Sequence, residues 1–146
     1  MNGHIFETFR LIIKRGDITE ESADAIVNAA NTALAGGGGV DGAIHGAGGP
    51  SIAAECRDII KRIGRLSTGS AAATTAGSLS AKYIIHAVGP IWLNGGDTEL
   101  AALRSAYENS IEEARKLGAA TICFPAISAG AYGFPPEAAA KAALPP

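Results

Sequence analysis

Two segments of this chain combine several glycines with few charged side chains, and both could hold an anion through the main chain. Residues 36–42 contain four consecutive glycines followed by Val40 and Asp41, and residues 128–133 form a second glycine-containing stretch. Glycine lets main-chain N–H groups approach a ligand closely, and a helix that follows such a loop adds the positive end of its dipole. The pattern therefore predicts two loops that bind a phosphate-containing group.

Cationic side chains are absent from the sequence around both loops. No Lys or Arg lies between Arg15 and Arg57, and none lies between Lys116 and Lys141. If the loops hold phosphates, they do so with main-chain amide dipoles. The alternative for the four-glycine run alone is a flexible connector, and the second loop of the same kind favours anion binding over it.

Asp41 is the acidic residue closest to the glycine run. A carboxylate is a poor phosphate ligand, but it can orient a water molecule toward an ester. The alternative is an acid in the first turn of a helix, where it stabilises the helix dipole by about 0.3–1 kcal/mol. His45 follows one helical turn later, where a neutral histidine of the core or behind the site is favoured, and His86 is expected in or just below the site.

The elements that must position these residues alternate along the chain. Apolar and β-branched runs predict strands over residues 6–14, 25–28, 70–75, 83–88 and 121–125. Helices are expected over residues 40–47, 50–63 and 98–117 and from Pro135 or Pro136 onward. This alternation indicates an α/β domain with a mostly parallel sheet covered on both faces. Ligands of such sheets bind beyond the carboxyl ends of the strands, where residues 16–19 and both glycine loops lie.

Length and composition exclude several classes of protein. The 146 residues argue for one domain, and 47% hydrophobic with 18% charged residues is not the composition of a disordered chain. The net charge of −2 disfavours general binding to nucleic acid or to an anionic membrane. No apolar run approaches the roughly 20 residues of a membrane span. Two separated cysteines, Cys56 and Cys123, encode neither a disulfide framework nor a thiolate metal site, so we expect a cytoplasmic protein.

Three better-known motifs fit less well. Residues 37–42 match G-x-G-x-x-G, but they lie too far past their strand for a dinucleotide-binding Rossmann site. No phosphate-binding G-x-x-x-x-G-K-[ST] sequence occurs. Residues 126–130 faintly resemble the nucleophile elbow of a serine esterase, but such an enzyme needs a later histidine and the last one is His86.

Five motifs in order resemble a macro domain of the MacroD-type branch. They are GDIT at 16–19, AIVNAAN at 25–31, GGGGVDGAIH at 36–45, AKYIIHAVGP at 81–90 and FPAISAGAYGFP at 124–135, and they cover nearly the whole chain. The resemblance implies a three-layer α/β/α fold with a mixed, mostly parallel central sheet. The chain ends at Pro145–Pro146, before the last strand and helix of such domains. We therefore expect residues 1–146 to form a single macro domain with a truncated C-terminus.

The resemblance also implies an ADP-ribose site. Asp17 would accept a hydrogen bond from the adenine amino group, and the Ile18 N–H would face a ring nitrogen. Asn31 would hold the distal ribose, and Asn31 and Asp41 would be the catalytic residues. The residues implied around the diphosphate are Gly38, Gly39 and Val40 on one side and Ser128, Ala129, Gly130, Ala131 and Tyr132 on the other. Phe134 would pack on the distal ribose.

By the same resemblance, the function is hydrolysis of ADP-ribosyl esters. The expected substrates are proteins that carry ADP-ribose on acidic side chains, and O-acetyl-ADP-ribose, with water oriented by Asp41 and with no metal or cofactor. One alternative is a non-catalytic module that binds ADP-ribose on proteins. Another is an RNA-binding module, which the net charge of −2 disfavours.

Overall fold

A four-stranded sheet forms the centre of the molecule in the computed structural model, which describes residues 2–5, 9–93 and 95–144. Its strand order is β4 (Ala71–Thr75), β5 (Tyr83–Val88), β3 (Ala25–Ala30) and β6 (Ile122–Cys123). β3 pairs in parallel with both β5 and β6, whereas β4 pairs antiparallel to β5. The expected mixed, mostly parallel sheet is confirmed.

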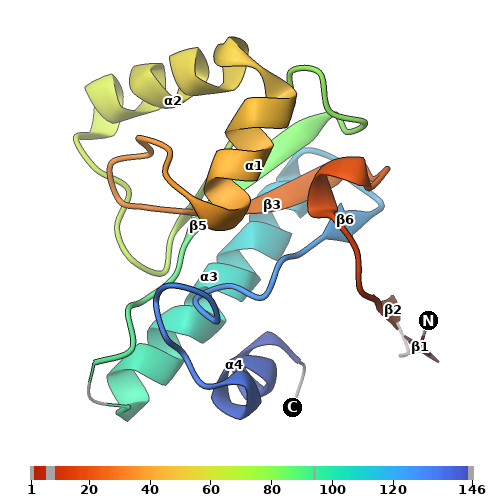
Figure 1. Ribbon diagram of the computed structural model, residues 1–146, viewed down its shortest axis with the longest axis vertical. Helices are drawn as coiled ribbons and strands as arrows, with labels where there is room; N and C mark the ends of the chain where they lie inside the picture. Colours follow the sequence, from red (N-terminus) through yellow and green to blue (C-terminus); the bar gives the residue numbers. More distant parts are fainter. Residues whose placement is uncertain (1, 6–8, 94, 145–146) are drawn as a thin grey trace.

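Helices cover both faces of this sheet (Figure 1). α1 (Gly39–Gly48) and α2 (Pro50–Ile63) lie on one face, and α3 (Asp97–Lys116) and α4 (Pro136–Ala143) lie on the other. Each begins within a residue or two of the position that the sequence predicts. The three-layer α/β/α architecture is therefore confirmed.

Strand residues alternate between the two helical layers because successive side chains of a strand point to opposite faces. Ile26 and Ile84 pack in the core with α1 and α2, whereas Val27 and Ile85 pack in the core with α3 and α4. All four are 0% exposed. Asn28 and His86 continue the alternation on the α1–α2 side, so polar groups interrupt that core.

The N-terminal segment forms a separate hairpin. β1 (Asn2–Ile5) pairs antiparallel with β2 (Arg10–Ile13), and the two make a sheet of their own. The strand expected over residues 6–14 is thus found at Arg10–Ile13, while residues 6–8 lie outside the described part of the chain. Among the described residues, no helix has the length and apolar character needed to cross a membrane.

Candidate functional site

The glycine loop after β3 is closed by the side chain of Asn31. Its Nδ2 donates to the Gly36 carbonyl at 2.9 Å, and its Oδ1 accepts from the Ala35 N–H at 3.1 Å. The loop also packs tightly on the first turn of α1, because a Cβ at Gly42 would lie 2.5 Å from the Gly37 carbonyl oxygen. Asn31 therefore holds the loop in shape, and its predicted contact with a ribose stays a prediction.

The start of α1 presents an uncovered main chain. Gly38 caps the helix without a side-chain hydrogen bond, and Gly39, at a φ of 58°, is its first residue. A Cβ placed at either glycine would have no described atom within 4 Å. The first N–H groups of a helix have no partner within the helix. This helix start can thus accept an anion, as predicted for Gly38, Gly39 and the half-buried Val40.

Asp41 follows at once and is 6% exposed. Its Oδ1 accepts a hydrogen bond from Asn28 Nδ2 at 2.9 Å and lies 3.3 Å from His45 Nε2. Its Oδ2 lies on the side of Gly37, 3.5 Å from where a Cβ of that glycine would be. One carboxylate oxygen is therefore held by the protein, and the other faces the glycine loop.

A buried chain of hydrogen bonds runs from Asp41 into the core. Asn28 and His86 lie opposite each other in the β3–β5 register, and Asn28 Nδ2 is 3.1 Å from His86 Nδ1. His86 Nε2 is 3.0 Å from the Thr74 hydroxyl, which itself donates to the Thr75 carbonyl. Because that hydroxyl proton is used, His86 Nε2 carries the hydrogen and Nδ1 accepts from Asn28. This tautomer of His86 therefore fixes the orientation of the Asn28 side-chain amide, which in turn holds Asp41.

The groups behind Asp41 are neutral. Burial, with a smaller effect of the nearby His45, lowers the pKa of His86 to about 4, so the ring is uncharged at pH 7. Burial and the Asp41 charge raise the pKa of the Cys56 thiol to about 11. Asn28 Oδ1 is buried without a hydrogen-bond partner. The Asp41 carboxylate therefore sits against an uncharged, partly unsatisfied polar pocket.

Three potential metal ligands meet in this pocket. Donor atoms of His45, Cys56 and His86 lie within 4.8 Å of one another, the one such group found in the described part of the chain. Cys56 Sγ is 3.6 Å from His86 Nε2, the nitrogen that donates to Thr74. A metal bound there would have to displace that hydrogen bond. This cluster could not be predicted from the sequence, because its members come from three separate elements, α1, α2 and β5.

The second glycine loop folds back on itself after β6. Ser128 has a φ of 63°, its carbonyl accepts from the Phe134 N–H at 2.8 Å, and the Tyr132 carbonyl accepts from the Trp92 N–H at 2.8 Å. Ser128 Oγ is buried without a hydrogen-bond partner. Gly89, at the end of β5, has no room for a Cβ because Ser128 and Ile127 press against it. The two loops at the ends of β5 and β6 therefore interlock.

The remaining predicted residues differ in exposure. Ala129 and Tyr132 are half-buried, and Gly130 and Ala131 are exposed. Phe134 is 1% exposed and meets Trp92 edge-on, with ring centroids 4.7 Å apart. Protein atoms therefore cover the Phe134 ring in the core between the sheet and α3, and its contact with a ribose stays a prediction.

Asp17 caps the start of the short helix η1 (Ile18–Glu20), which contacts α1. Its Oδ1 accepts from the Thr19 hydroxyl at 2.6 Å and the Thr19 N–H at 2.9 Å, and these bonds lower the pKa of the exposed carboxyl. Ile18 is half-buried against the α1–α2 core. Asp17 thus presents an ionised carboxylate at a fixed position, as an acceptor for an amino group requires.

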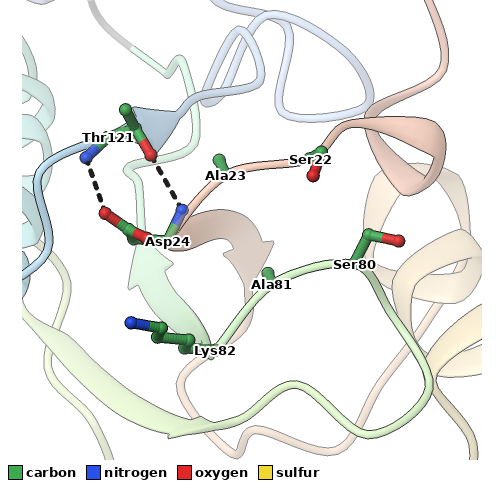
Figure 2. A pocket seen from close by; sticks show the side chains of 7 residues that line it. All are labelled: Ser22, Ala23, Asp24, Ser80, Ala81, Lys82 and Thr121. Atoms are coloured by element: carbon green, nitrogen blue, oxygen red, sulfur yellow. Dashed lines mark hydrogen bonds between the residues drawn. The ribbon is translucent and has the colours of Figure 1, made fainter.

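Two cavities lie outside these predicted residues. One, of about 450 Å³, lies at the amino ends of β3, β5 and β6, between Asp24, Lys82 and Thr121 (Figure 2). The other, of about 400 Å³, lies between α2 and the loop that follows Asn31.

An α/β sheet with two glycine loops beyond its parallel strands, both without Lys or Arg and one of them at a helix start, is an arrangement that can hold a phosphorylated ligand. The comparisons with known proteins are more specific. The model of the Macro domain family matches residues 27–143, and the chain belongs to this family.

Close relatives and solved structures agree with this assignment. A macro domain-containing protein of Caldanaerobacter subterraneus is 55% identical over 138 residues, which is 94% of this chain and 78% of that protein. A protein of Pantoea vagans named O-acetyl-ADP-ribose deacetylase 1 is 53% identical over 92% of this chain and 79% of its own length. The Oceanobacillus iheyensis macrodomain with ADP superposes with a TM-score of 0.92 at 41% identity, covering 97% of this chain and 76% of that one.

Proposed function

We propose that this protein binds ADP-ribose and hydrolyses its esters, namely ADP-ribose linked to acidic side chains of proteins and O-acetyl-ADP-ribose. The single observation that carries the proposal is the Asp41 carboxylate, with Oδ1 held by Asn28 and Oδ2 turned toward the glycine loop. The deacetylase name of the Pantoea vagans relative and the ADP in the Oceanobacillus iheyensis macrodomain support the choice of ligand and reaction.

The resemblance to macro domains and the lack of Lys and Arg in the two loops support one position for the ligand. The diphosphate lies between the start of α1 and the loop of residues 128–132, where main-chain N–H groups bind it. The adenine amino group donates to Asp17, and the distal ribose lies toward Asn31 and Asp41. The ester carbonyl then stands beside the free Oδ2 of Asp41.

Asp41 orients the attacking water. Oδ2 accepts a hydrogen bond from the water, whose oxygen forms a bond to the ester carbonyl carbon. The bond from that carbon to the ribose oxygen breaks, and the proton lost by the water ends on the ribose hydroxyl, with a substrate phosphate sharing the role of base. Asn28 holds Oδ1, and the neutral His86 holds the Asn28 amide in turn, so that the free oxygen keeps its direction.

Replacing Asp41 tests the proposal. Asp41→Ala should keep ADP-ribose affinity within about tenfold and reduce turnover of an ADP-ribosylated glutamate peptide by at least about a hundredfold. Affinity is measured by calorimetry and turnover by release of free ADP-ribose. Asp41→Asn keeps the shape of the side chain and should lose turnover too, because an amide cannot accept the proton.

The matched control is Asp58→Ala, which removes an exposed acid of α2 and should leave both affinity and turnover unchanged. Full turnover by Asp41→Ala would remove this residue from the mechanism. Binding of ADP-ribose without turnover of either ester by the unsubstituted protein would refute the hydrolase and favour a protein that only binds ADP-ribose.

A further inference from the structure

We propose that the cavity between α2 and the loop after Asn31 docks an acidic stretch of polypeptide next to the ADP-ribosylated side chain. This groove, called the α2 groove below, is lined by Ala33, Leu34 and Ala35 of the loop and by Arg57, Ile60 and Lys61 of α2. The inference rests on the proposed function and adds a second, separate contact with protein substrates.

The α2 groove shares its wall with the predicted ribose-binding loop. Asn31 bonds to Ala35 and Gly36, so the residues that line the groove lie inside the turn that its side chain closes. The Leu66 N–H donates to the Thr32 carbonyl at 2.9 Å and ties this turn to the segment after α2. The α2 groove therefore lies directly beside the loop at which the proposed function places the distal ribose.

The α2 groove carries cationic side chains, whereas the two glycine loops contain no Lys or Arg. Residues 57–65 contain four cations and one acid, within a chain whose net charge is −2. Arg57 and Lys61 lie one turn apart on α2, and both are exposed. Neither forms an ion pair with any described residue. These two cations are available for an acidic partner beside a phosphate site that lacks cations.

The lining favours polypeptide over nucleic acid. No aromatic side chain lines the groove on which a base could stack, and the lining is mostly alanine, leucine and isoleucine. An apolar floor with two cations at one side fits a peptide that carries carboxylates and an aliphatic side chain. Carboxylates in the chain that flanks the esterified residue would meet Arg57 and Lys61. O-acetyl-ADP-ribose has no such chain and does not reach them.

The experiment compares three substrates with the Arg57→Glu/Lys61→Glu variant. They are O-acetyl-ADP-ribose, a peptide ADP-ribosylated on a glutamate flanked by glutamates and a leucine, and the same peptide with glutamines as flanks. In the unsubstituted protein, the acidic peptide should have a KM at least about fivefold lower than the glutamine peptide. The variant should raise the KM of the acidic peptide about tenfold and leave kcat/KM for O-acetyl-ADP-ribose unchanged. The Lys61→Glu variant should show a smaller effect, and Lys82→Glu, the same charge change at the opposite end of the sheet, should show none.

A parallel binding measurement keeps the test independent of catalysis. In the Asp41→Ala background, the acidic ADP-ribosylated peptide should bind more tightly than free ADP-ribose, and Arg57→Glu/Lys61→Glu should abolish that gain. Failure of the hydrolase alone leaves this affinity gain in place. Three results would overturn the docking proposal: an equal loss of kcat/KM on all three substrates, an unchanged KM for the acidic peptide in the double variant, and a gain in affinity that survives the double variant. Competition for binding by single-stranded RNA, but not by the unmodified acidic peptide, would overturn it as well.

Discussion

The two ends of the central sheet differ in how their polar groups are hydrogen-bonded. At the carboxyl ends of the parallel strands, Asn28 Oδ1 and Ser128 Oγ are buried without partners, and the start of α1 carries no side-chain cap. At the amino ends, Asp24 Oδ2 accepts from the N–H groups of Ala120 and Thr121, and the Asp24 N–H donates to the Thr121 hydroxyl (Figure 2).

We interpret this difference as that between the proposed ligand site and a structural clamp. Leaving a buried polar group unpaired costs about 1–3 kcal/mol, so such groups gather where a ligand can satisfy them. The Asp24 carboxylate instead accepts hydrogen bonds from the protein itself, and these bonds connect the start of β3 to the start of β6. The cavity beside Asp24 therefore lies at hydrogen-bonded groups that hold the sheet together.

The largest expected effect concerns His86, at the buried end of the Asp41 network. Its pKa is lowered to about 4 in the folded protein, against 6.5 for an ordinary histidine. As the pH falls from 7 to 4, the unfolded chain takes up this proton near pH 6.5, whereas the folded protein begins to take it up only near pH 4. The free energy of unfolding therefore falls by about 3 kcal/mol over that window. Urea unfolding at a series of pH values measures this slope.

His86→Asn removes the titrating group and should flatten the curve between pH 6.5 and 4, whatever its own stability. Carboxylates with lowered pKa values, such as Asp24, change the free energy of unfolding mainly below this pH window. The slope below the window is therefore an internal reference for both proteins. Identical slopes in both proteins would mean that His86 is protonated in the folded state, and the tautomer assigned above would be wrong.

The next effect concerns the tight contact between the glycine loop and α1. Gly42→Ala places a Cβ against the Gly37 carbonyl and should cost about 1–3 kcal/mol of unfolding free energy, together with a loss of ADP-ribose affinity as the loop shifts. Gly46→Ala, in the same helix, has no described atom within 4 Å and should stabilise the protein by about 0.5–1 kcal/mol. Thermal unfolding and calorimetry measure both variants, and equal stabilities for the two would contradict the contact.

Local pattern was enough to predict most of the fold. The β5 bounds, the three-layer architecture and all four helices follow from hydrophobic periodicity and from glycine and proline breaks. The N-terminal hairpin was missed because Asn2–Ile5 has no apolar alternation, and its strand exists through pairing with Arg10–Ile13. Pairing partners depend on the tertiary fold, which local composition does not encode.

The candidate site was predictable only in part. Asp41 and the glycine loops are visible as a motif, but the partner of Asp41 is Asn28, thirteen residues earlier on another element. The roles of His86, Thr74 and Cys56 depend on the β3–β5 and β4–β5 registers and on how α2 packs. One hint was available: polar residues at Asn28 and His86 interrupt strands that are otherwise apolar, and a buried polar residue needs a partner.

The smallest expected effect compares two carboxylates at opposite ends of the sheet. Asp17 accepts hydrogen bonds from the hydroxyl and the N–H of Thr19, and Asp24 accepts them from main-chain N–H groups. These bonds lower the pKa of each carboxyl. Asp17→Ala should weaken ADP-ribose binding roughly tenfold, as expected for one lost hydrogen bond to adenine. Asp24→Ala should lower Tm by loosening the β3–β6 clamp and leave that affinity unchanged. Calorimetric titration with ADP-ribose and with ribose-5-phosphate, which lacks adenine, separates the two, because only ADP-ribose should lose affinity in Asp17→Ala. An Asp24 variant with the larger loss of affinity would place the ligand at the amino ends of the strands and reverse the contrast between the two ends.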